Sequence, residues 1–475
     1  MLSVDEITRS TGGTLCQPRD REVKGYSIDT RTINEGDFFI PLPGSRTDGH
    51  KFLDEAFAKG ASGAIANSRN YLGDDYYNLV VVDDTEKALL QMAKFYRNSF
   101  HIPTIGVTGS WGKTTTKELI SSILSIEGSV HKSPGNYNTE YGLPLAILEM
   151  DEEVEFAVFE LGLQYPGDLE TLSQALSPTH GLITGAGKVH LGNFSGVDEV
   201  ASEKLKITKG MERNSKILIN GDSSPLHRKS GGIPGFNFIK YGLENESRCK
   251  YYASDVKVLG TAGLKFSLNR SMAEGLLNDD IFPLLLETEL NSAANVYNVL
   301  AAASLALELD VESSSVKQGV RFEPLPQRMQ PKSFPKGTII DDTYNANPAA
   351  TRNALEYLST LKADGKKIFV FGDMMELGDE ALGLHRNLAN SVMDAGVDRV
   401  LAVGEFTGAL VEELSKQGDK PVSCPVAEWF ESKESLVSKL GRVLEGKDNL
   451  VLVKGSRGME MEKVVDFLTS DSSMN

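Results

Sequence analysis

The sequence predicts an α/β protein built from three consecutive domains. The chain has 475 residues, and a single domain usually takes ~100–200 residues. Short apolar runs rich in β-branched residues alternate with amphipathic segments along the chain, which is typical of mostly parallel sheets covered by helices on both faces. A segment rich in proline and basic residues, PLPQRMQPKSFPKG at 324–337, predicts a hinge between two such series.

The first predicted domain is a small α/β unit over residues 1–84. Short strands and helices alternate in it, in the runs EVKGYSIDTR, GDFFIPLPG, FLDEAFAKGASGAIA and YNLVVVDD. A helix is expected next, over TEKALLQMAKFYRNSF at 85–100. This helix leads into the second domain.

The second predicted domain spans residues 85–330. The run PTIGVTG at 103–109 is apolar and β-branched, which predicts a buried parallel strand. The segment TTTKELISSILSIEG at 114–128 places most of its apolar side chains on one face and ends in glycine, which predicts a helix. Three further strands are expected in EFAVFELG, HGLITGAG and SKILING, at 155–162, 180–187 and 215–221.

The third predicted domain spans residues 331–475. Its four expected strands each end in a turn rich in glycine or asparagine, namely TIIDDTYNANP at 338–348, KKIFVFGDM at 366–374, DRVLAVGEF at 398–406 and NLVLVKGSRG at 449–458. In open α/β sheets, ligands bind beyond such strand ends.

Composition excludes several classes of partner. The net charge of −17 opposes binding to nucleic acids or to an anionic membrane surface, because both require basic patches. No run approaches the ~18 apolar residues of a membrane span, and the N-terminus lacks the apolar region of a signal peptide. The three cysteines, Cys16, Cys249 and Cys424, are odd in number and far apart, which predicts free thiols in a reducing compartment. We expect a cytoplasmic monomer.

The stretch VTGSWGKTTTKELI at 107–120 resembles a phosphate-binding loop but departs from the standard pattern G-x-x-x-x-G-K-[ST]. Val107 stands where the first glycine belongs. A strand, a tight glycine turn and a helix start nevertheless place backbone N–H groups and the positive helix end around an anion. Lys113 would add a positive charge and Thr114 a hydroxyl for Mg²⁺. The alternative is a plain turn that happens to contain a lysine. Phosphate chemistry does not explain Trp111, which would either cover the nucleotide or simply pack.

Other candidates are ambiguous on spacing alone. Glu160 ends a strand near this loop and could hold Mg²⁺, or it could be a surface acid. His190 is a lone histidine, which is more often structural. Lys204 lies in a predicted amphipathic helix, where a solvent-facing position is expected by default. The amides of the runs PGNYNTEYGLP and SAANVYN, and the runs DDTYNANP and KGSRG, are either ordinary turn and helix residues or ligand contacts.

Together these runs resemble the Mur ligase family, ATP-dependent enzymes that build the peptide of bacterial cell-wall precursors. TGSWGKTTTKE is close to that family's loop T-G-[ST]-x-G-K-T-[ST], which lacks the earlier glycine. SIDTR, GDFFIPLPG and TDGHKF are similar to the family's first-domain pattern for the UDP end of the substrate. YNANP, GDMMELG and LVKGSRG are similar to the branch that adds D-alanyl-D-alanine to a UDP-N-acetylmuramoyl-tripeptide.

The resemblance implies a role for each domain. The first would be a small α/β UDP-binding domain, the second a P-loop ATP-binding domain with a parallel sheet, and the third a Rossmann-like α/β domain. ATP contacts would come from Gly109, Ser110, Trp111, Gly112, Lys113, Thr114, Thr115, Asn295, Arg328 and Asp342. Substrate contacts would come from Ser27, Asp29, Arg31, Asp48, Gly49, His50, Asn136, Asn138, Thr139, Asn347 and Ser456.

The resemblance also implies two Mg²⁺ ions and three catalytic side chains, Lys113, His190 and Lys204. Thr114 and Glu160 would hold one ion and His190 the second. Lys204 aligns with the family's carbamylated lysine, in which carbon dioxide turns the amine into a carboxylate that a metal site tolerates. The reaction implied is amide formation through an acyl phosphate, with D-alanyl-D-alanine as the amine.

Three departures from the family pattern concern fine specificity. Gly185 replaces an asparagine and Gly192 an acid in ITGAGKVHLG, ELGLQ stands for the usual E-M-G-A-N, and Ala294 stands where histidine is common. A family member with another amine substrate is therefore one alternative. A folyl-polyglutamate-type ligase is another, although it generally lacks a UDP-binding first domain. A regulatory ATPase that does not ligate is the third.

Overall fold

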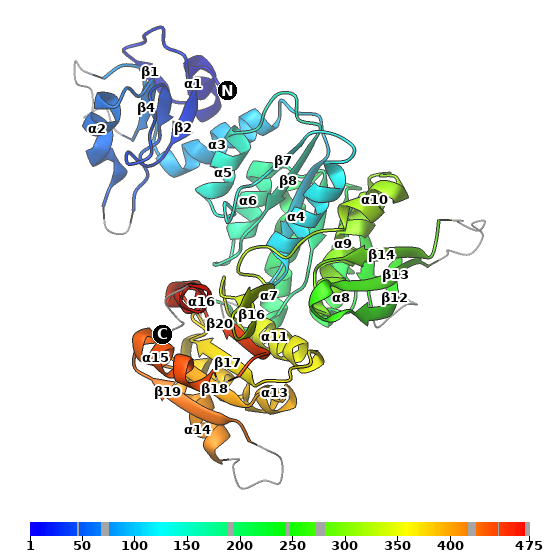
Figure 1. Ribbon diagram of the computed structural model, residues 1–475. Coiled ribbons are helices and arrows are strands. Elements are labelled where there is room, and N and C mark those ends of the chain that lie inside the picture. Colours follow the sequence, from blue (N-terminus) through cyan, green and yellow to red (C-terminus); the bar gives the residue numbers. More distant parts are fainter. Residues whose placement is uncertain are drawn as a thin grey trace.

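The computed structural model describes residues 1–44, 47–67, 76–187, 193–243, 248–271, 281–416, 424–444 and 446–470. Within these residues it has three β-sheets that follow one another along the chain, and each is covered by helices (Figure 1). The predicted class, an α/β protein with three domains, is confirmed. The domain limits at residues 84 and 330 stay a prediction.

The first sheet has five strands in the order β1-β5-β4-β3-β2. Its strands are β1 (Thr14–Cys16), β2 (Gly25–Ser27), β3 (Asp37–Phe39), β4 (Gly63–Ala66) and β5 (Leu79–Val81). All pairs are parallel except β1 with β5. Two helices accompany it, α1 (Val4–Thr11) and α2 (Leu53–Ala58). Helix α1 begins with a capping box in which Ser3 and Glu6 satisfy each other's backbone N–H groups.

The central sheet has nine strands in the order β14-β13-β12-β11-β10-β9-β6-β8-β7. Six are β6 (Thr104–Thr108), β7 (Val130–Lys132), β8 (Phe156–Glu160), β9 (His180–Ile183), β10 (Lys216–Asn220) and β11 (Asn237–Gly242). The last three are β12 (Tyr251–Val258), β13 (Leu264–Arg270) and β14 (Leu284–Thr288). Across the sheet, the strands β7, β8, β6, β9, β10, β11 and β12 pair in parallel with their neighbours. Strands β12, β13 and β14 form an antiparallel extension that the sequence analysis did not predict.

Helices cover both faces of the central sheet. They are α3 (Thr85–Arg97), α4 (Lys113–Leu124), α5 (Gly142–Leu148), α6 (Asp168–Leu176), α7 (Val197–Lys204), α8 (Ser224–Ser230), α9 (Ala294–Glu308) and α10 (Ser313–Gly319). Side chains alternate between the faces along each strand. In β10, Ile217 and Ile219 join the core under α3, α5 and α6, while Leu218 joins the core under α4 and α9.

The first domain and the central domain share one hydrophobic core. Helix α3 lies between them, and its Leu89 and Met92 belong to a single buried cluster that includes Ile7 of α1 and Leu143 of α5. The C-terminal sheet instead has its own cores on its two faces.

The C-terminal sheet has six strands in the order β15-β16-β20-β17-β18-β19. They are β15 (Gln330–Phe334), β16 (Gly337–Asp342), β17 (Lys367–Gly372), β18 (Arg399–Val403), β19 (Val426–Phe430) and β20 (Asn449–Lys454). Its helices are α11 (Pro348–Thr360), α12 (Ala381–Arg386), α13 (Ala389–Asp394), α14 (Gly408–Lys416), α15 (Lys433–Val443) and α16 (Glu462–Thr469). Strand β15 pairs antiparallel with β16, so half of the predicted hinge segment belongs to this sheet.

No helix within the described ranges is both long enough and apolar enough to cross a membrane. The predicted free thiols are confirmed, since Cys16, Cys249 and Cys424 form no disulfide.

Candidate active site

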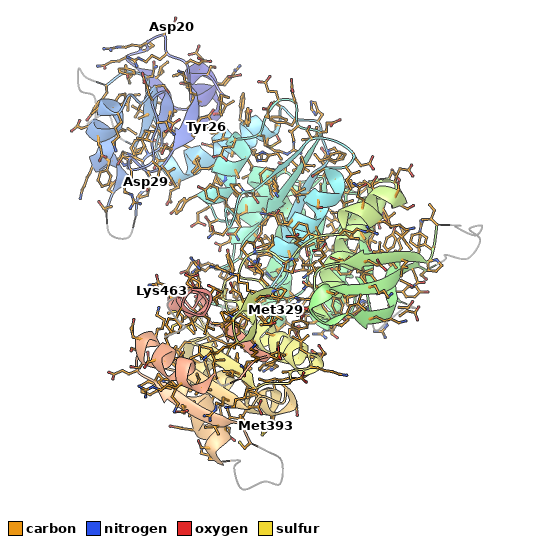
Figure 2. All side chains as sticks on the ribbon, in the orientation of Figure 1. Asp20, Tyr26, Asp29, Met329, Met393 and Lys463 are labelled. Atoms are coloured by element: carbon orange, nitrogen blue, oxygen red, sulfur yellow. The ribbon has the colours of Figure 1, made fainter. Side chains whose placement is uncertain are left out.

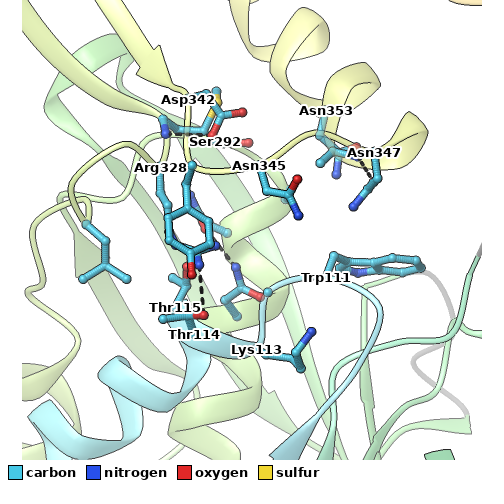
Figure 3. A pocket seen from close by; sticks show the side chains of 18 of the residues that line it. Trp111, Lys113, Thr114, Thr115, Ser292, Arg328, Asp342, Asn345, Asn347 and Asn353 are labelled. Atoms are coloured by element: carbon cyan, nitrogen blue, oxygen red, sulfur yellow. Dashed lines mark hydrogen bonds between the residues drawn. The ribbon is translucent and has the colours of Figure 1, made fainter. Parts of the chain in front are cut away.

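A cavity of about 460 Å³ lies between the carboxyl ends of the central and C-terminal sheets (Figure 3). The loop after β6, the end of β8 and the start of α9 line it from the central domain. The linker before β15, the loop after β16 and the start of α11 line it from the C-terminal side. The predicted site residues that share this cavity are Ser110, Trp111, Gly112, Lys113, Thr114, Thr115, Asn136, Asn138, Glu160, Asn295, Arg328, Asp342 and Asn347.

The loop after β6 has the backbone of a phosphate cradle. Gly112 has a φ of 71° and stands directly before α4, a left-handed conformation that favours glycine. A Cβ there would also lie 2.2 Å from Oδ1 of Asn298, and a Cβ at Gly109 would lie 1.8 Å from Oγ1 of Thr184. The turn therefore brings the backbone N–H groups at the start of a twelve-residue helix to the cavity.

Thr114 connects three polar groups in the cavity. Its Oγ1 donates to Oε2 of Glu160 at 2.8 Å and accepts from Nη2 of Arg328 at 3.0 Å. Nδ2 of Asn138 donates to the other carboxylate oxygen of Glu160 at 2.8 Å. Glu160 is almost fully buried. A buried carboxylate beside a threonine hydroxyl is an oxygen ligand set of the kind that Mg²⁺ prefers.

Lys113 points its amine toward the same carboxylate. Nζ donates to the carbonyl of Gly109 at 3.1 Å and lies 4.0 Å from Oε1 of Glu160. Burial and the guanidinium of Arg328 lower the pKa of Lys113, while Glu160 acts in the opposite direction. Lys113, Arg328 and the buried carboxylate of Glu160 thus line the same cavity.

Lys204 corrects the sequence analysis, which placed it on a solvent-facing helix surface. It ends α7 and is fully buried. Burial, together with the positive charge of Lys113, lowers the pKa of its amine well below the ordinary value. Lys204 is therefore a buried amine in surroundings that disfavour its positive charge. It does not line the cavity itself.

The C-terminal side of the cavity holds residues that the sequence analysis did not name. The guanidinium of Arg328 lies 3.8 Å from the ring centroid of Tyr344, a cation–π contact. The buried amine of Lys454 donates to Asp342 and to the carbonyl of Asn345. Tyr344 and Asn345 lie within the run YNANP, and Lys454 lies within LVKGSRG. The sequence analysis singled out both runs as candidate ligand contacts but did not name these three residues.

Several predicted contacts act as supports. The side chain of Asn347 caps α11 by accepting from the backbone N–H of Ala350. Nδ2 of Asn298 donates to Oδ1 of Asn295 at 2.9 Å. Ser456 is buried and does not line the cavity. Its Oγ accepts from the N–H of Met375 at 2.8 Å and donates to the carbonyl of Ala346. Thr139 caps the turn into α5 and is likewise absent from the lining.

Trp111 packs on a strip of backbone that only glycine allows. A Cβ on Gly185 would lie 2.6 Å from Cζ2 of its indole, and a Cβ on Gly187 would lie 2.3 Å from Cζ3. Ser110 donates its backbone N–H to the carbonyl of Gly185 at 3.0 Å and accepts from the N–H of Gly187 at 3.0 Å. The departure at Gly185 and the unexplained Trp111 are therefore parts of the same contact.

The first-domain candidates lie apart from the cavity. Figure 2 shows Asp29 in the first domain, well away from Met329, which lines the cavity. Arg31 forms a two-point ion pair with Asp29, and Oγ of Ser27 donates to the carbonyl of Asp29. These residues surround the end of β2.

His50 is buried, and both of its ring nitrogens have partners. Nδ1 lies 2.6 Å from Oδ1 of Asp48, and Nε2 accepts from the N–H of Asn67. Because Nε2 accepts, Nδ1 carries the proton and donates to Asp48. Gly49 lets this loop pass close to Leu42, since a Cβ would lie 2.7 Å from the backbone nitrogen of Leu42. His50 thus positions Asp48.

His190 and Gly192 lie outside the described residues. Within the described part of the chain, no three His, Cys, Asp or Glu side chains cluster as a ready metal cage.

Family models and named relatives match this chain along nearly its whole length. Three family models match, described as "Mur ligase family, catalytic domain" over residues 22–97, "Mur ligase middle domain" over 107–306 and "Mur ligase, glutamate ligase domain" over 327–457. A relative from Bacillus subtilis, named UDP-N-acetylmuramoyl-tripeptide–D-alanyl-D-alanine ligase, is 31% identical, with 98% of each chain covered. The relative of that name from Escherichia coli is 29% identical, with 99% of each chain covered.

Solved structures agree as well. MurF from Acinetobacter baumannii superposes with a TM-score of 0.87 at 26% identity, covering 98% of both chains. MurF ligase from Thermotoga maritima, solved in complex with ADP, superposes with a TM-score of 0.78 at 26% identity, covering 95% of this chain and 98% of the other. With a relative above 30% identity matched along nearly its whole length, this chain belongs to the Mur ligase family.

Proposed function

We propose that this protein joins D-alanyl-D-alanine to UDP-N-acetylmuramoyl-tripeptide at the expense of ATP, in the synthesis of peptidoglycan precursors. The observation that carries the proposal is the cavity in which Lys113 and Thr114 of the phosphate loop, together with Glu160 at the end of β8, face the C-terminal domain. The names of the full-length relatives supply the substrates.

The reaction has two steps. A carboxylate oxygen of the tripeptide attacks the γ-phosphorus of ATP, ADP leaves, and an acyl phosphate forms. The amine of the dipeptide then attacks the acyl carbon, and the tetrahedral intermediate expels phosphate while the nitrogen loses a proton. Lys113 and the N–H groups at the start of α4 neutralise charge on the phosphates. Arg328, Asp342 and Asn295 would hold the rest of the nucleotide.

The oxygen ligands at the cavity fit Mg²⁺. Thr114 and Glu160 would hold one ion, and a bound Mg²⁺ supplies positive charge that offsets the transferring phosphoryl group. His190 would hold a second ion. Lys204 would be the lysine that carbon dioxide carbamylates, since it is fully buried and burial together with the charge of Lys113 lowers the pKa of its amine.

The first domain would take the UDP end of the substrate through Ser27, Asp29 and Arg31. In this arrangement the uridine lies far from the phosphate loop, and the peptide reaches into the cavity past Asn136, Asn138 and Thr139. We further propose that the protein works as a cytoplasmic monomer without nucleic-acid or membrane partners.

The deciding experiment measures phosphate release from ATP and Mg²⁺ with UDP-N-acetylmuramoyl-tripeptide, with and without D-alanyl-D-alanine. We expect release to require the dipeptide and the product mass to increase by the dipeptide residue. Release without any amine would instead indicate a regulatory ATPase. Release with another amine or acid would indicate a different ligase, such as a folyl-polyglutamate-type enzyme.

A further inference from the structure

The indole of Trp111 occupies a position that phosphate binding does not explain. It stands in the middle of the phosphate loop, between Ser110 and Gly112, and it is half-buried. Its inner face packs on Gly185 and Gly187. Its carbonyl accepts a hydrogen bond from Oγ1 of Thr184. The side chain is thus fixed on its inner side, and the rest of it lines the cavity.

Two of the nucleotide candidates, Arg328 and Asp342, lie in a different part of this cavity from the indole of Trp111. Figure 3 shows Arg328 and Asp342 together on one side, with Thr114 below Arg328, and Trp111 on the other side, beyond Lys113. On that side, Asn347 and Asn353 at the start of α11 lie across the cavity from the indole. The two regions meet at Lys113, where the phosphate transfer would take place.

The chemistry around the indole suits a short, zwitterionic peptide with small apolar side chains. Asn345, Asn347 and Asn353 offer amide donors and acceptors, and the N-terminal end of the thirteen-residue helix α11 favours a carboxylate. Ala350 and the indole of Trp111 offer apolar surface. Methyl groups packed against an aromatic face gain burial without disturbing the polar contacts.

We propose that Trp111, held on Gly185 and Gly187, forms the apolar wall of the amine-substrate subsite and determines the preference for small D-amino-acid side chains. This inference rests on the proposed function, because it names the residue that contacts the dipeptide. The dipeptide would lie between the indole and the start of α11, with its amine toward Lys113 and the acyl phosphate.

The first test compares Trp111→Ala with the matched control Trp429→Phe. Trp429 is the other tryptophan of the chain, lies on β19 and is about half exposed. In Trp111→Ala we expect KM for D-alanyl-D-alanine to rise about tenfold, the loss typical of small apolar contacts, and KM for ATP to change less than about twofold. Trp429→Phe should leave both constants unchanged.

The second test uses the glycine strip. Gly185→Ala places a methyl group against the indole and should displace it, so it should raise KM for the dipeptide as well. The double variant Trp111→Ala with Gly185→Ala removes the clash and should be no worse than Trp111→Ala alone. Additive losses would overturn the claim that the two residues form one unit.

Controls separate the possible failures. An ADP-induced rise in melting temperature, retained in Trp111→Ala and in the conservative Trp111→Phe, shows that the loop still folds. If KM for ATP rises as much as KM for the dipeptide, or if neither changes, the inference is wrong and the indole covers the nucleotide or only packs. If the wild-type protein releases no phosphate in response to the dipeptide, the proposed function fails and this inference fails with it.

Discussion

Lys113 and Lys204 both belong to the central domain but have different electrostatic surroundings. The amine of Lys113 lies 4.0 Å from a carboxylate oxygen of Glu160. The pKa of Lys204 is instead lowered by burial and by the positive charge of Lys113. A buried amine beside another cation loses its proton more readily than one beside an acid. Residue type alone shows two similar amines. Burial lowers the pKa of both, but Glu160 opposes the shift at Lys113, whereas the positive charge of Lys113 adds to the shift at Lys204.

The first prediction concerns Lys113. Lys113→Ala should lower phosphate release at least about 100-fold, because it removes a charge placed where the transferring phosphoryl group becomes negative. Phosphate release measures the loss, and circular dichroism checks that the protein still folds. Full activity in a folded variant would remove the phosphate-loop assignment.

The second prediction concerns Lys204. Lys204→Ala should lose about 100-fold or more in ligation rate, and formate or acetate should restore part of it by supplying the missing carboxylate. Lys204→Arg serves as the control, since a guanidinium fills the space and stays charged, and rescue should then fail. A folded Lys204→Ala that acetate does not rescue would count against the carbamate.

The strands that the sequence marks by apolar runs were predicted correctly. The strands β6, β8, β9 and β10 and the four strands that end in glycine or asparagine turns lie where the apolar runs predicted them. The antiparallel extension was missed because β12 carries no continuous apolar run and three of its eight residues are exposed. The burial of Lys204 and the pairing of Trp111 with Gly185 depend on contacts between distant segments, which periodicity does not report.

The third prediction concerns the first turn of α11. Asn347→Ala should lower the unfolding free energy by about 1 kcal/mol, because it removes an N-cap. Ser432→Ala is the matched control, since Ser432 caps α15 through the N–H of Ser435 at 3.2 Å, and it does not line the cavity. Urea unfolding should show similar losses in both variants. Only Asn347→Ala should also raise KM for the dipeptide, and equal kinetics in the two variants would make Asn347 purely structural.

At the scale of the whole molecule, Arg328 bridges the central and C-terminal domains. It reaches Thr114 of the phosphate loop while its guanidinium stacks on Tyr344. Closure of a third domain over a reactive acyl phosphate would exclude water from it. The contact between domains therefore runs through a side chain that also lines the cavity.

The fourth prediction follows from this bridge. Arg328→Lys keeps the charge but loses the planar group that stacks and donates at a fixed angle, so kcat for ligation should fall about tenfold. KM for the UDP-linked substrate should stay unchanged, because Arg328 is not among the proposed contacts of that substrate. Steady-state kinetics measure both constants. A higher KM for that substrate with kcat intact would contradict the bridging role.

The shared core of the first two domains has a consequence for the history of the chain. Domains are exchanged between proteins where few contacts cross the join. Because α3 buries side chains against both α1 and α5, a first domain acquired from another gene would have to bring along a matching α3 or repack it. The linker before β15 crosses no comparable core, so recombination can replace the C-terminal domain, with its half of the amine subsite, more readily than the domain that carries the UDP candidates.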